Sequence, residues 1–515
     1  MRGYVLKNLL LLSGHVSAKP ANEPTVAQAK VLRFLLHKTK ATRFGKQYNF
    51  AGLLRNGSNA QLMQAFRLAV PIYNYDMMQE QWWHLLGKGE HNISWPGNAA
   101  YFALSSGTSQ AASKYLPLSK DSIRSVKQAG TEMARVIAAM PGAAKMLERK
   151  MLSLNGSTTL QQYGGVEAGD FSGIMMKNSP GWYKERILPP IEVHALKSWS
   201  QKLDHIVQYA PQWDVAILSA FPVWAVPMME AVMEKYRLNN IHEIWPNLAL
   251  YLHGGMSIEP YRLRLAKCFA KPLPRLESYV ASEGYIAHQL NPDSNGMDLI
   301  CHGGLYFEFV PFEQPHFDEN GSLMQGAKAI SLQDVEENKL YALLLSSNSG
   351  AWRYLLGDVI RFTSLTPPRV QWMGRTAQFV SLAGEHVSVA NLEMAFARAT
   401  ATVGAHVKEF AVWPDDTNLP VAHRWIIAGS NVPESLCAEI DAELCRLNDD
   451  YHTLRKQQLL GRPTIHSLTN SHFGQWMKGL GKTDAQHKYL RVVKEGQLPE
   501  GFSSNITQVT AGRKP

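Results

Sequence analysis

The amino-acid sequence predicts an α/β protein with a large, layered N-terminal domain that includes a β-barrel-like subdomain, followed by a small α+β C-terminal domain. At 515 residues the chain exceeds the ~250 to 300 residues at which a single hydrophobic core stops growing. From residue 98 onward short apolar strands alternate with helices, whereas residues 297 to 381 contain several strands in succession. After Gly384 the pattern is that of a compact α+β unit. We therefore predict a boundary near Thr376, between domains 1–375 and 376–515.

The first residues, Met1 to Ala18, loosely resemble a signal peptide. Arg2 and Lys7 precede the apolar run Leu9 to Leu12, but this run is too short and is soon broken. No stretch approaches the ~18 uninterrupted apolar residues of a membrane span. We expect an amphipathic helix packed on the main domain, and a soluble, cytoplasmic protein without membrane insertion. Residues 24 to 42 carry an apolar stripe at helical spacing and predict a second helix.

The later elements follow from the same kind of pattern. Alternation is clearest in two pairs, strand 215–218 with helix 228–236 and strand 248–252 with helix 261–269. The succession of strands, which predicts a partly antiparallel sheet or a barrel, comprises 305–310, 340–345, 359–362, 370–373 and 379–381. In the C-terminal domain we expect helix 390–400, strands 406–413 and 424–428, and helix 433–447.

Composition and charge exclude several classes of protein. Hydrophobic residues make up 45% of the chain and charged residues 18%, which argues against wholesale disorder and against a fibrous repeat. The net charge is +9, but the basic residues are scattered rather than gathered along a nucleic-acid track, so we expect no nucleic-acid partner. A phosphate-rich small ligand fits at least as well, although charge alone favours an ordinary soluble surface. Four cysteines without a Cys-x-x-Cys pair indicate a reducing compartment.

The first candidate site is a small, hydroxyl-rich turn made of Ser105, Ser106, Gly107, Thr108 and Ser109. It follows the apolar residues 101 to 104 and precedes Lys114. A strand that leads into such a turn lets backbone N–H groups and hydroxyls converge on phosphate oxygens, and Lys114 adds a point charge. Taken alone, such a cluster is more often an ordinary loop.

The second candidate is the segment Tyr279 to Gly284, which contains Ser282 and Glu283. An aromatic face can stack on a purine, and a carboxylate at a strand end can hold the magnesium ion that accompanies a nucleoside triphosphate. The alternatives are a core tyrosine and a carboxylate at the surface or near a helix N-cap.

Two further candidates lie near the predicted boundary. Asp358 follows Gly357 between apolar residues, where its carboxylate could accept hydrogen bonds from ribose hydroxyls. Arg375 follows Gly374 and could reach a ribose or a phosphate. Each has an ordinary alternative, since Gly-Asp is common in hairpin turns and an arginine at a domain junction usually faces solvent.

In their order and spacing these segments resemble the core motifs of the adenylate-forming superfamily, which includes acyl-CoA synthetases and luciferases. The nearest resemblance is to the auxin-responsive promoter family of acyl acid amido synthetases, whose motifs read S-S-G-T-S-x-G-x-x-K, Y-x-x-S-E-G and Y-R-x-G-D. The likeness extends over most of the chain, including Thr42 to Gly45, Phe221 to Trp224, and Gln486 to Arg491, which is similar to the family's terminal Q-x-K-x-P-R segment. No single motif is enough to identify the family. The order and spacing of the motifs together make the match specific.

Three positions depart from the family pattern. Ala111 stands for the second glycine of the loop, Leu355 for the arginine of Y-R-x-G-D, and Leu490 for the terminal proline. Ala111 requires a backbone without positive φ. Arg353, two residues before Leu355, is the nearby cation that could replace the missing arginine. A catalytically reduced, nucleotide-binding relative is therefore one alternative.

The resemblance implies an ATP- and Mg²⁺-dependent ligase. A carboxylate oxygen attacks the α-phosphate of ATP, pyrophosphate leaves, and an acyl-AMP remains. The resemblance assigns the phosphates to residues 105–109 and Lys114, the magnesium to Glu283, the ribose to Asp358 and Arg375, and the adenine face to Tyr279, with Ser282 in the same ATP-binding set.

In the implied second half-reaction an amine, expected to be an amino acid, attacks the acyl carbon and AMP leaves. The C-terminal domain would pivot about residues 375–378 and Lys488 would deliver a positive charge. We expect the acyl pocket between residues 221–229 and the turn His253 to Gly255. A thioester ligase that uses coenzyme A or a carrier protein is the other alternative. The sequence predicts neither the particular acid and amine nor the oligomeric state.

Overall fold

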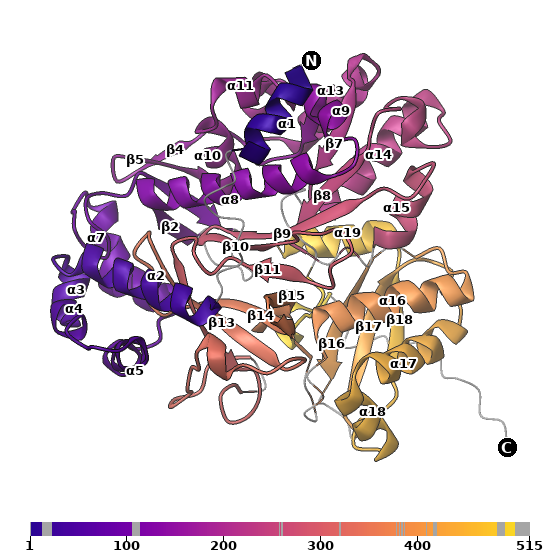
Figure 1. The fold of residues 1–515 in the computed structure, drawn as a ribbon. Helices are drawn as coiled ribbons and strands as arrows, with labels where there is room; N and C mark the ends of the chain where they lie inside the picture. The colour runs from indigo at the N-terminus through magenta and orange to yellow at the C-terminus, as the bar shows by residue number, and fades with distance from the viewer. Residues whose placement is uncertain are drawn as a thin grey trace. The chain divides into compact units, whose positions relative to one another are not determined.

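The computed structural model describes residues 2–12, 23–105, 114–256, 258, 261–318, 321–376, 379–380, 382, 385, 387–407, 409–415, 420–480 and 490–499. The chain divides into two compact units (Figure 1). Unit 1 comprises Met1–Pro311, Lys328–Leu356 and Ile360–Trp372. Unit 2 comprises Phe312–Ala327, Gly357–Val359 and Met373–Pro515.

Unit 1 is built around a sheet in which the described strands follow the order β12-β13-β14-β15-β11-β10-β9-β8-β7-β3-β6. Its parallel part consists of β3 (Lys150–Ser153), β6 (Ile187–Leu188), β7 (Val215–Ser219), β8 (Leu250–Gly254) and β9 (Arg275–Ala281). The rest consists of β10 (Gly284–His288), β11 (Met297–Leu299), β12 (Leu305–Pro311), β13 (Leu340–Ser347), β14 (Tyr354–Leu365) and β15 (Pro368–Arg375). The pairs β9–β10, β10–β11, β11–β15 and β12–β13 are antiparallel, so the strands expected in 297–381 extend the same sheet.

A smaller sheet of unit 1 has the order β2-β1-β5-β4. Its strands are β1 (Tyr101–Ser105), β2 (Lys114–Leu118), β4 (Gln161–Tyr163) and β5 (Val166–Asp170). β1 pairs with β2 in antiparallel and with β5 in parallel orientation.

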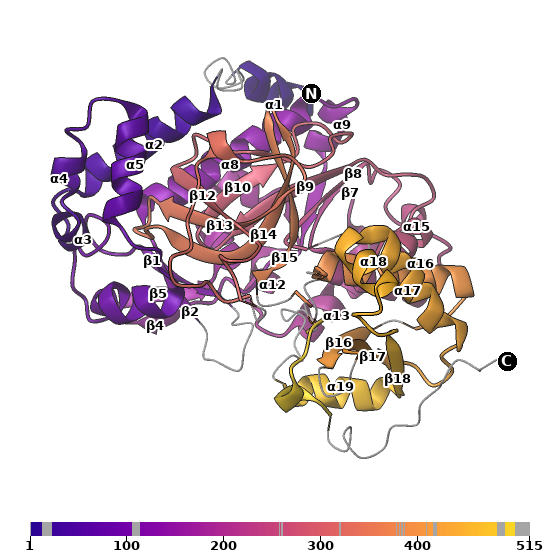
Figure 2. The same cartoon turned by 90° about the horizontal axis from the view of Figure 1, so that it is seen from below.

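Helices cover the sheets of unit 1. α8 (Lys120–Ala139) contacts β10, and α1 (Arg2–Leu12) lies beside α8 and α9 (Ala143–Glu148) (Figure 1). α2 (Pro24–Thr39) packs against β12 and α5 (Asn59–Ala69), as Figure 2 also shows. The remaining helices include α3 (Arg43–Gln47), α4 (Phe50–Leu53), α6 (Tyr75–Met78), α7 (His84–Gly87), α10 (Phe171–Lys177), α11 (Gly181–Lys184), α12 (Ile191–His194), α13 (Trp199–Tyr209), α14 (Pro222–Tyr236) and α15 (Arg262–Cys268). No described helix has both the length and the apolar character needed to cross a membrane.

Unit 2 contains a sheet of β16 (Phe410–Asp415), β17 (Ala422–Ala428) and β18 (Thr464–Leu468), with α16 (Val389–Val403), α17 (Ser435–Leu447), α18 (Asp449–Lys456) and α19 (Asn470–Gly479). Successive side chains of a strand point to opposite faces of a sheet. Accordingly, Val412 and Trp425 pack with the apolar residues of α16 and α17, whereas Trp413 and Ile426 pack with Phe473 of α19. The alternation thus builds an apolar cluster on each face.

Most of the predicted elements are confirmed, with shifted ends. The helix predicted over 24–42 is α2, and the helices predicted over 390–400 and 433–447 are α16 and α17. The strand predicted over 379–381 is wrong where it is described, because Val380 forms only an isolated bridge with Val387. The hairpin-turn alternative for Gly357 and Asp358 is also wrong, since both lie inside the strand β14.

Candidate functional site

The hydroxyl-rich turn connects the two strands of a hairpin. Ser105, the last residue of β1, is the register partner of Lys114, the first residue of β2. The loop between them, with Ser106, Gly107, Thr108, Ser109 and Ala111, lies outside the described residues. Leu104 is also aligned with Asp170 in β5, so β1 is paired on both sides at its carboxyl end. The two residues that flank the loop, Ser105 and Lys114, are therefore held next to each other.

Lys114 is held over an aromatic ring at this point. Its Nζ lies 5.1 Å from the ring centroid of Tyr75, a distance at which a cation is attracted to the ring face. The Tyr75 hydroxyl accepts a hydrogen bond of 2.9 Å from the backbone N–H of Tyr115. Burial raises the pKa of Tyr75, so the phenol stays neutral. A positive charge therefore stands where the hydroxyl-rich loop ends.

The second candidate segment is also a hairpin. Ala281 of β9 is aligned with Gly284 of β10, so Ser282 and Glu283 form the two-residue connection. Gly284 has φ +153°, and a Cβ there would approach the side chain of Leu305 to 3.1 Å, so glycine suits this position. The Glu283 side chain is half-buried at the turn. A carboxylate is thus presented where two strands end.

Tyr279 lies in the same hairpin, but within the main hydrophobic cluster of unit 1, and it is only 5% exposed. In its packing, Tyr279 is therefore a core residue, which was the alternative to a purine-stacking role.

In unit 2, Asp358 and Arg375 lie together. The Nε of Arg375 is 3.1 Å from Oδ1 of Asp358, and the Asp358 side chain is 6% exposed while that of Arg375 is 34% exposed. Gly357, immediately before the aspartate in β14, has φ +82°, which glycine adopts without steric cost. A carboxylate and a guanidinium side by side offer acceptors and donors to neighbouring hydroxyls.

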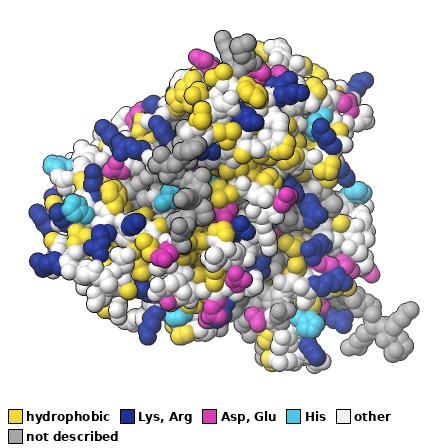
Figure 3. All heavy atoms as spheres, in the orientation of Figure 1, with side chains coloured by type: hydrophobic (Ala, Val, Ile, Leu, Met, Phe, Trp, Pro, Cys, Tyr) yellow, Lys and Arg dark blue, Asp and Glu magenta, His cyan; other side chains and the backbone are white. Residues whose placement is uncertain are grey.

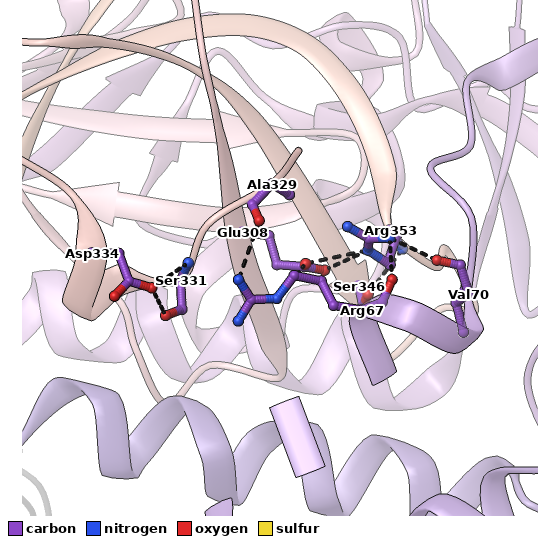
Figure 4. Close-up of polar contacts among 8 residues, drawn as sticks. All are labelled: Arg67, Val70, Glu308, Ala329, Ser331, Asp334, Ser346 and Arg353. Carbon is purple, nitrogen blue, oxygen red and sulfur yellow. Dashed lines mark hydrogen bonds and ion pairs between the residues drawn. The ribbon is translucent and has the colours of Figure 1, made fainter. Parts of the chain in front are cut away.

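Arg353, the cation nearest in sequence to the missing arginine of the family motif, makes hydrogen bonds to Glu308 and Val70 inside unit 1 (Figure 4). Its Nε donates to both carboxylate oxygens of Glu308, at 3.2 and 3.0 Å, and its Nη1 donates to the carbonyls of Arg67 and Val70 at 2.9 and 2.6 Å. Arg353 is 5% exposed and Glu308 1% exposed. Burial raises the pKa of Glu308, and the charge and hydrogen bonds of Arg353 oppose this rise.

Lys488 lies outside the described residues, but the chain is described again from Leu490. Arg491 is 8% exposed, and it is anchored by ion pairs to Glu393 at 3.1 Å and to Glu409 at 2.9 Å. Leu490 is buried in the cluster around α19. The terminal segment is therefore firmly attached to unit 2 just after Lys488.

The two segments expected to border the acyl pocket are in contact. The Phe221 ring lies against Gly255, where a Cβ would approach it to 2.7 Å, and Trp224 stacks on Trp199 with 5.6 Å between ring centroids. Phe221 is 38% exposed, whereas Met228 and Met229 are fully buried and belong to the core.

Sequence reasoning missed a buried cation near the carboxyl end of β3. Lys202 of α13 is 5% exposed, its Nζ donates to the carbonyl of Asn155 at 2.9 Å, and burial lowers its pKa. Burial, together with the charge of Lys202, lowers the pKa of His194 to about 4. His253, at the end of β8, has its pKa lowered to about 3, mainly by burial. No sequence pattern distinguishes Lys202 from an exposed lysine of an amphipathic helix.

The chain shares its fold with solved structures of an acyl-CoA ligase and of an acyl acid amido synthetase. It is similar to 2-hydroxyisobutyryl-CoA ligase in its postadenylation state, with a TM-score of 0.55 at 13% identity over 93% of this chain and 90% of that one. It is also similar to the GH3.15 acyl acid amido synthetase, with a TM-score of 0.72 at 18% identity over 95% of each chain. The chain belongs to the GH3 family, whose N-terminal, central and C-terminal domain models match residues 18–237, 299–375 and 390–497.

Curated relatives agree with this assignment. Jasmonoyl-L-amino acid synthetase GH3.5 of Oryza sativa subsp. japonica is 26% identical over 52% of this chain and 50% of its own length. Indole-3-acetic acid-amido synthetase GH3.4 of Arabidopsis thaliana is 27% identical over 52% and 47%. The chain thus spans about half the length of these two relatives. Jasmonoyl-L-amino acid synthetase JAR4 of Nicotiana attenuata is 23% identical over 93% of both chains.

Proposed function

We propose that the protein is an AMP-forming ligase that activates a carboxylic acid with ATP and joins it to the amine of an amino acid, with release of AMP and pyrophosphate. The observation that carries this proposal is the match of all three GH3 domain models, in order, to this one chain. The names of the relatives, which are amido synthetases for jasmonic and indole-3-acetic acid, support the amide product. We infer a soluble, cytoplasmic location for it.

In the first half-reaction an oxygen of the acid attacks the α-phosphorus of ATP, the bond to the β-phosphate oxygen breaks, and pyrophosphate leaves. In-line displacement at phosphorus needs positioning and charge neutralisation more than covalent help. Residues 105–109 at the end of β1 are assigned to the departing phosphates, and Lys114 neutralises their charge. Tyr279 is assigned to the adenine face and Ser282 to the same ATP-binding set, and Asp358 with Arg375 to the ribose hydroxyls.

The residues present fit a magnesium ion. Mg²⁺ prefers carboxylate oxygens together with substrate phosphates, and Glu283 offers a half-buried carboxylate at the turn between β9 and β10. When bound with ATP, the ion neutralises charge on the phosphate oxygens. Glu283 is therefore our candidate ligand.

In the second half-reaction the amine nitrogen attacks the acyl carbon, the bond to the AMP oxygen breaks, and the amine loses a proton. We assign this step to a rearrangement of residues 376–515 relative to residues 1–375, with Lys488 supplying positive charge. The attachment of Arg491 to Glu393 and Glu409 supports the idea that Lys488 moves with the C-terminal part.

The test is carboxylate-dependent ATP–pyrophosphate exchange with a panel of aromatic, indolic, fatty and hydroxy acids, followed by AMP release with amino acids or coenzyme A. We expect exchange with at least one acid, and faster AMP release with an amino acid. Faster release with coenzyme A would establish the thioester ligase instead. ATP binding without exchange for any acid would indicate a catalytically reduced relative and overturn the proposal.

A further inference from the structure

The first helix of the chain is apolar on both of its sides. One side packs on the protein: Gly3 is buried, and a Cβ there would approach the carbonyl oxygen of Ala144 in α9 to 2.1 Å. Leu6 and Leu10 of the same side are half-buried. Because the glycine allows this close approach, α1 is fixed on α8 and α9 as part of unit 1.

The other side of α1 carries large apolar side chains in the described structure. Tyr4 is 63% exposed, Val5 54%, Leu9 60% and Leu12 68%. At about 100° per residue these four positions fall within about 140° of the helix circumference, so they lie on one side of the helix. In Figure 3 hydrophobic side chains gather over α1 near the top of the view. A group of exposed large apolar side chains of this kind is typical of a contact surface.

Basic residues outnumber acidic ones on α1 and α9. α1 contains basic residues, Lys7 among them, and no acidic residue. Lys145 of α9 and Lys150, at the start of β3, are exposed, and Glu148 is the acidic residue between them. Because its inner side is already packed on the protein, a helix with leucine and an aromatic residue on its outer side and lysines on neighbouring elements can lie in the plane of an anionic membrane surface.

We propose that α1 is a peripheral docking surface for an anionic lipid bilayer, with Tyr4, Val5, Leu9 and Leu12 entering the boundary between headgroups and acyl chains. At 11 residues the helix is too short to span a bilayer, so it lies on the surface. A second copy of the chain is the less suitable occupant. A two-fold contact through α1 would bring the lysines of both copies toward each other.

The test is co-sedimentation of the full chain with vesicles of phosphatidylcholine alone, or with about one third phosphatidylserine. We expect binding to the anionic vesicles that weakens at high salt. Leu9→Gln with Leu12→Gln should lower the partition coefficient roughly ten-fold or more, because two apolar side chains no longer enter the bilayer. The matched control is Leu290→Gln, since Leu290 is 53% exposed and lies elsewhere in unit 1.

Circular dichroism and ATP–pyrophosphate exchange of the double variant should equal those of the wild type, which separates lost docking from lost folding. Lys7→Glu should weaken binding to the anionic vesicles alone. Absence of binding to both vesicle types overturns the proposal. So does a dimer in sedimentation velocity that the double variant abolishes, because the patch would then be a contact between copies.

Discussion

Replacing Arg353 by methionine should destabilise unit 1 strongly, because it leaves the Glu308 carboxylate buried without its partner. In the variant the nearest remaining guanidinium is that of Arg67, whose Nε is 3.9 Å from Glu308 Oε1. The carbonyls of Arg67 and Val70 also lose the donor that Nη1 supplies at 2.9 and 2.6 Å. Breaking a buried ion pair costs about 3 to 5 kcal/mol, so we expect a loss of ~4 kcal/mol in the free energy of unfolding.

The matched control is the double variant Arg353→Met with Glu308→Leu. It removes both buried charges and replaces them with apolar groups of similar size, which should bring stability back to within about 2 kcal/mol of the wild type. Since burial already raises the pKa of Glu308, the carboxyl in the single variant should take up a proton as pH falls. The destabilisation should therefore be largest at neutral pH and shrink in mild acid.

The assay is urea unfolding followed by tryptophan fluorescence, with Trp352 next to the substituted residue as one fully buried reporter. With the single variant Glu308→Leu added, the wild type and the three variants form a double-mutant cycle, from which we expect a coupling of at least ~2 kcal/mol between the two positions. If Arg353→Met costs less than about 1 kcal/mol, or if the two single costs simply add, the pair does not stabilise unit 1 in the way described.

Further predictions concern the candidate site and the buried histidines. Asp358→Asn should raise KM for ATP in pyrophosphate exchange by about 10- to 100-fold, because hydrogen bonds to a charged group are worth about 1.5 to 3 kcal/mol. An unchanged KM would contradict the assignment of Asp358 to the ribose. Lys114→Ala should lower kcat of exchange by about 10²-fold, whereas the control Lys120→Ala, at an exposed position, should not. The pKa values of His194 and His253 are lowered to about 4 and about 3. The unfolded chain therefore binds more protons below about pH 6.5, and stability should fall by about 4 kcal/mol between about pH 7.5 and pH 5. Urea unfolding at both pH values measures this loss, and a pH-independent midpoint would contradict it.

The sequence predicted those parts of the fold that depend on local pattern. The apolar residues 101–104 form β1, and the stripe beginning at Val26 forms α2. β2 was missed, because Lys114 to Leu118 contains a proline and does not alternate clearly. Its strand character comes from pairing with β1 and not from its own side chains.

At the site, sequence reasoning identified segments but not the partners of their side chains. Gly357 and Asp358 resemble a turn, but a glycine with positive φ is tolerated inside a strand, so β14 runs through them. The pairing of Arg353 with Glu308 joins residues 45 positions apart, and its bond to Val70 spans 283 positions. Contacts at such separations arise from the tertiary fold, and a hydrophobic pattern contains no record of them.

The short segment around Arg491 has a consequence for the solubility of unit 2. β16 is one of the two outer strands in the described sheet of unit 2. Its Val412 donates to the carbonyl of Arg491 at 2.7 Å and accepts from the N–H of Val493 at 2.9 Å. These residues thus occupy hydrogen-bonding positions that an outer strand would otherwise present to other molecules. A version of the protein shortened before Leu490 would expose this edge together with the apolar cluster behind it, and should aggregate through strand addition even where its other elements remain folded.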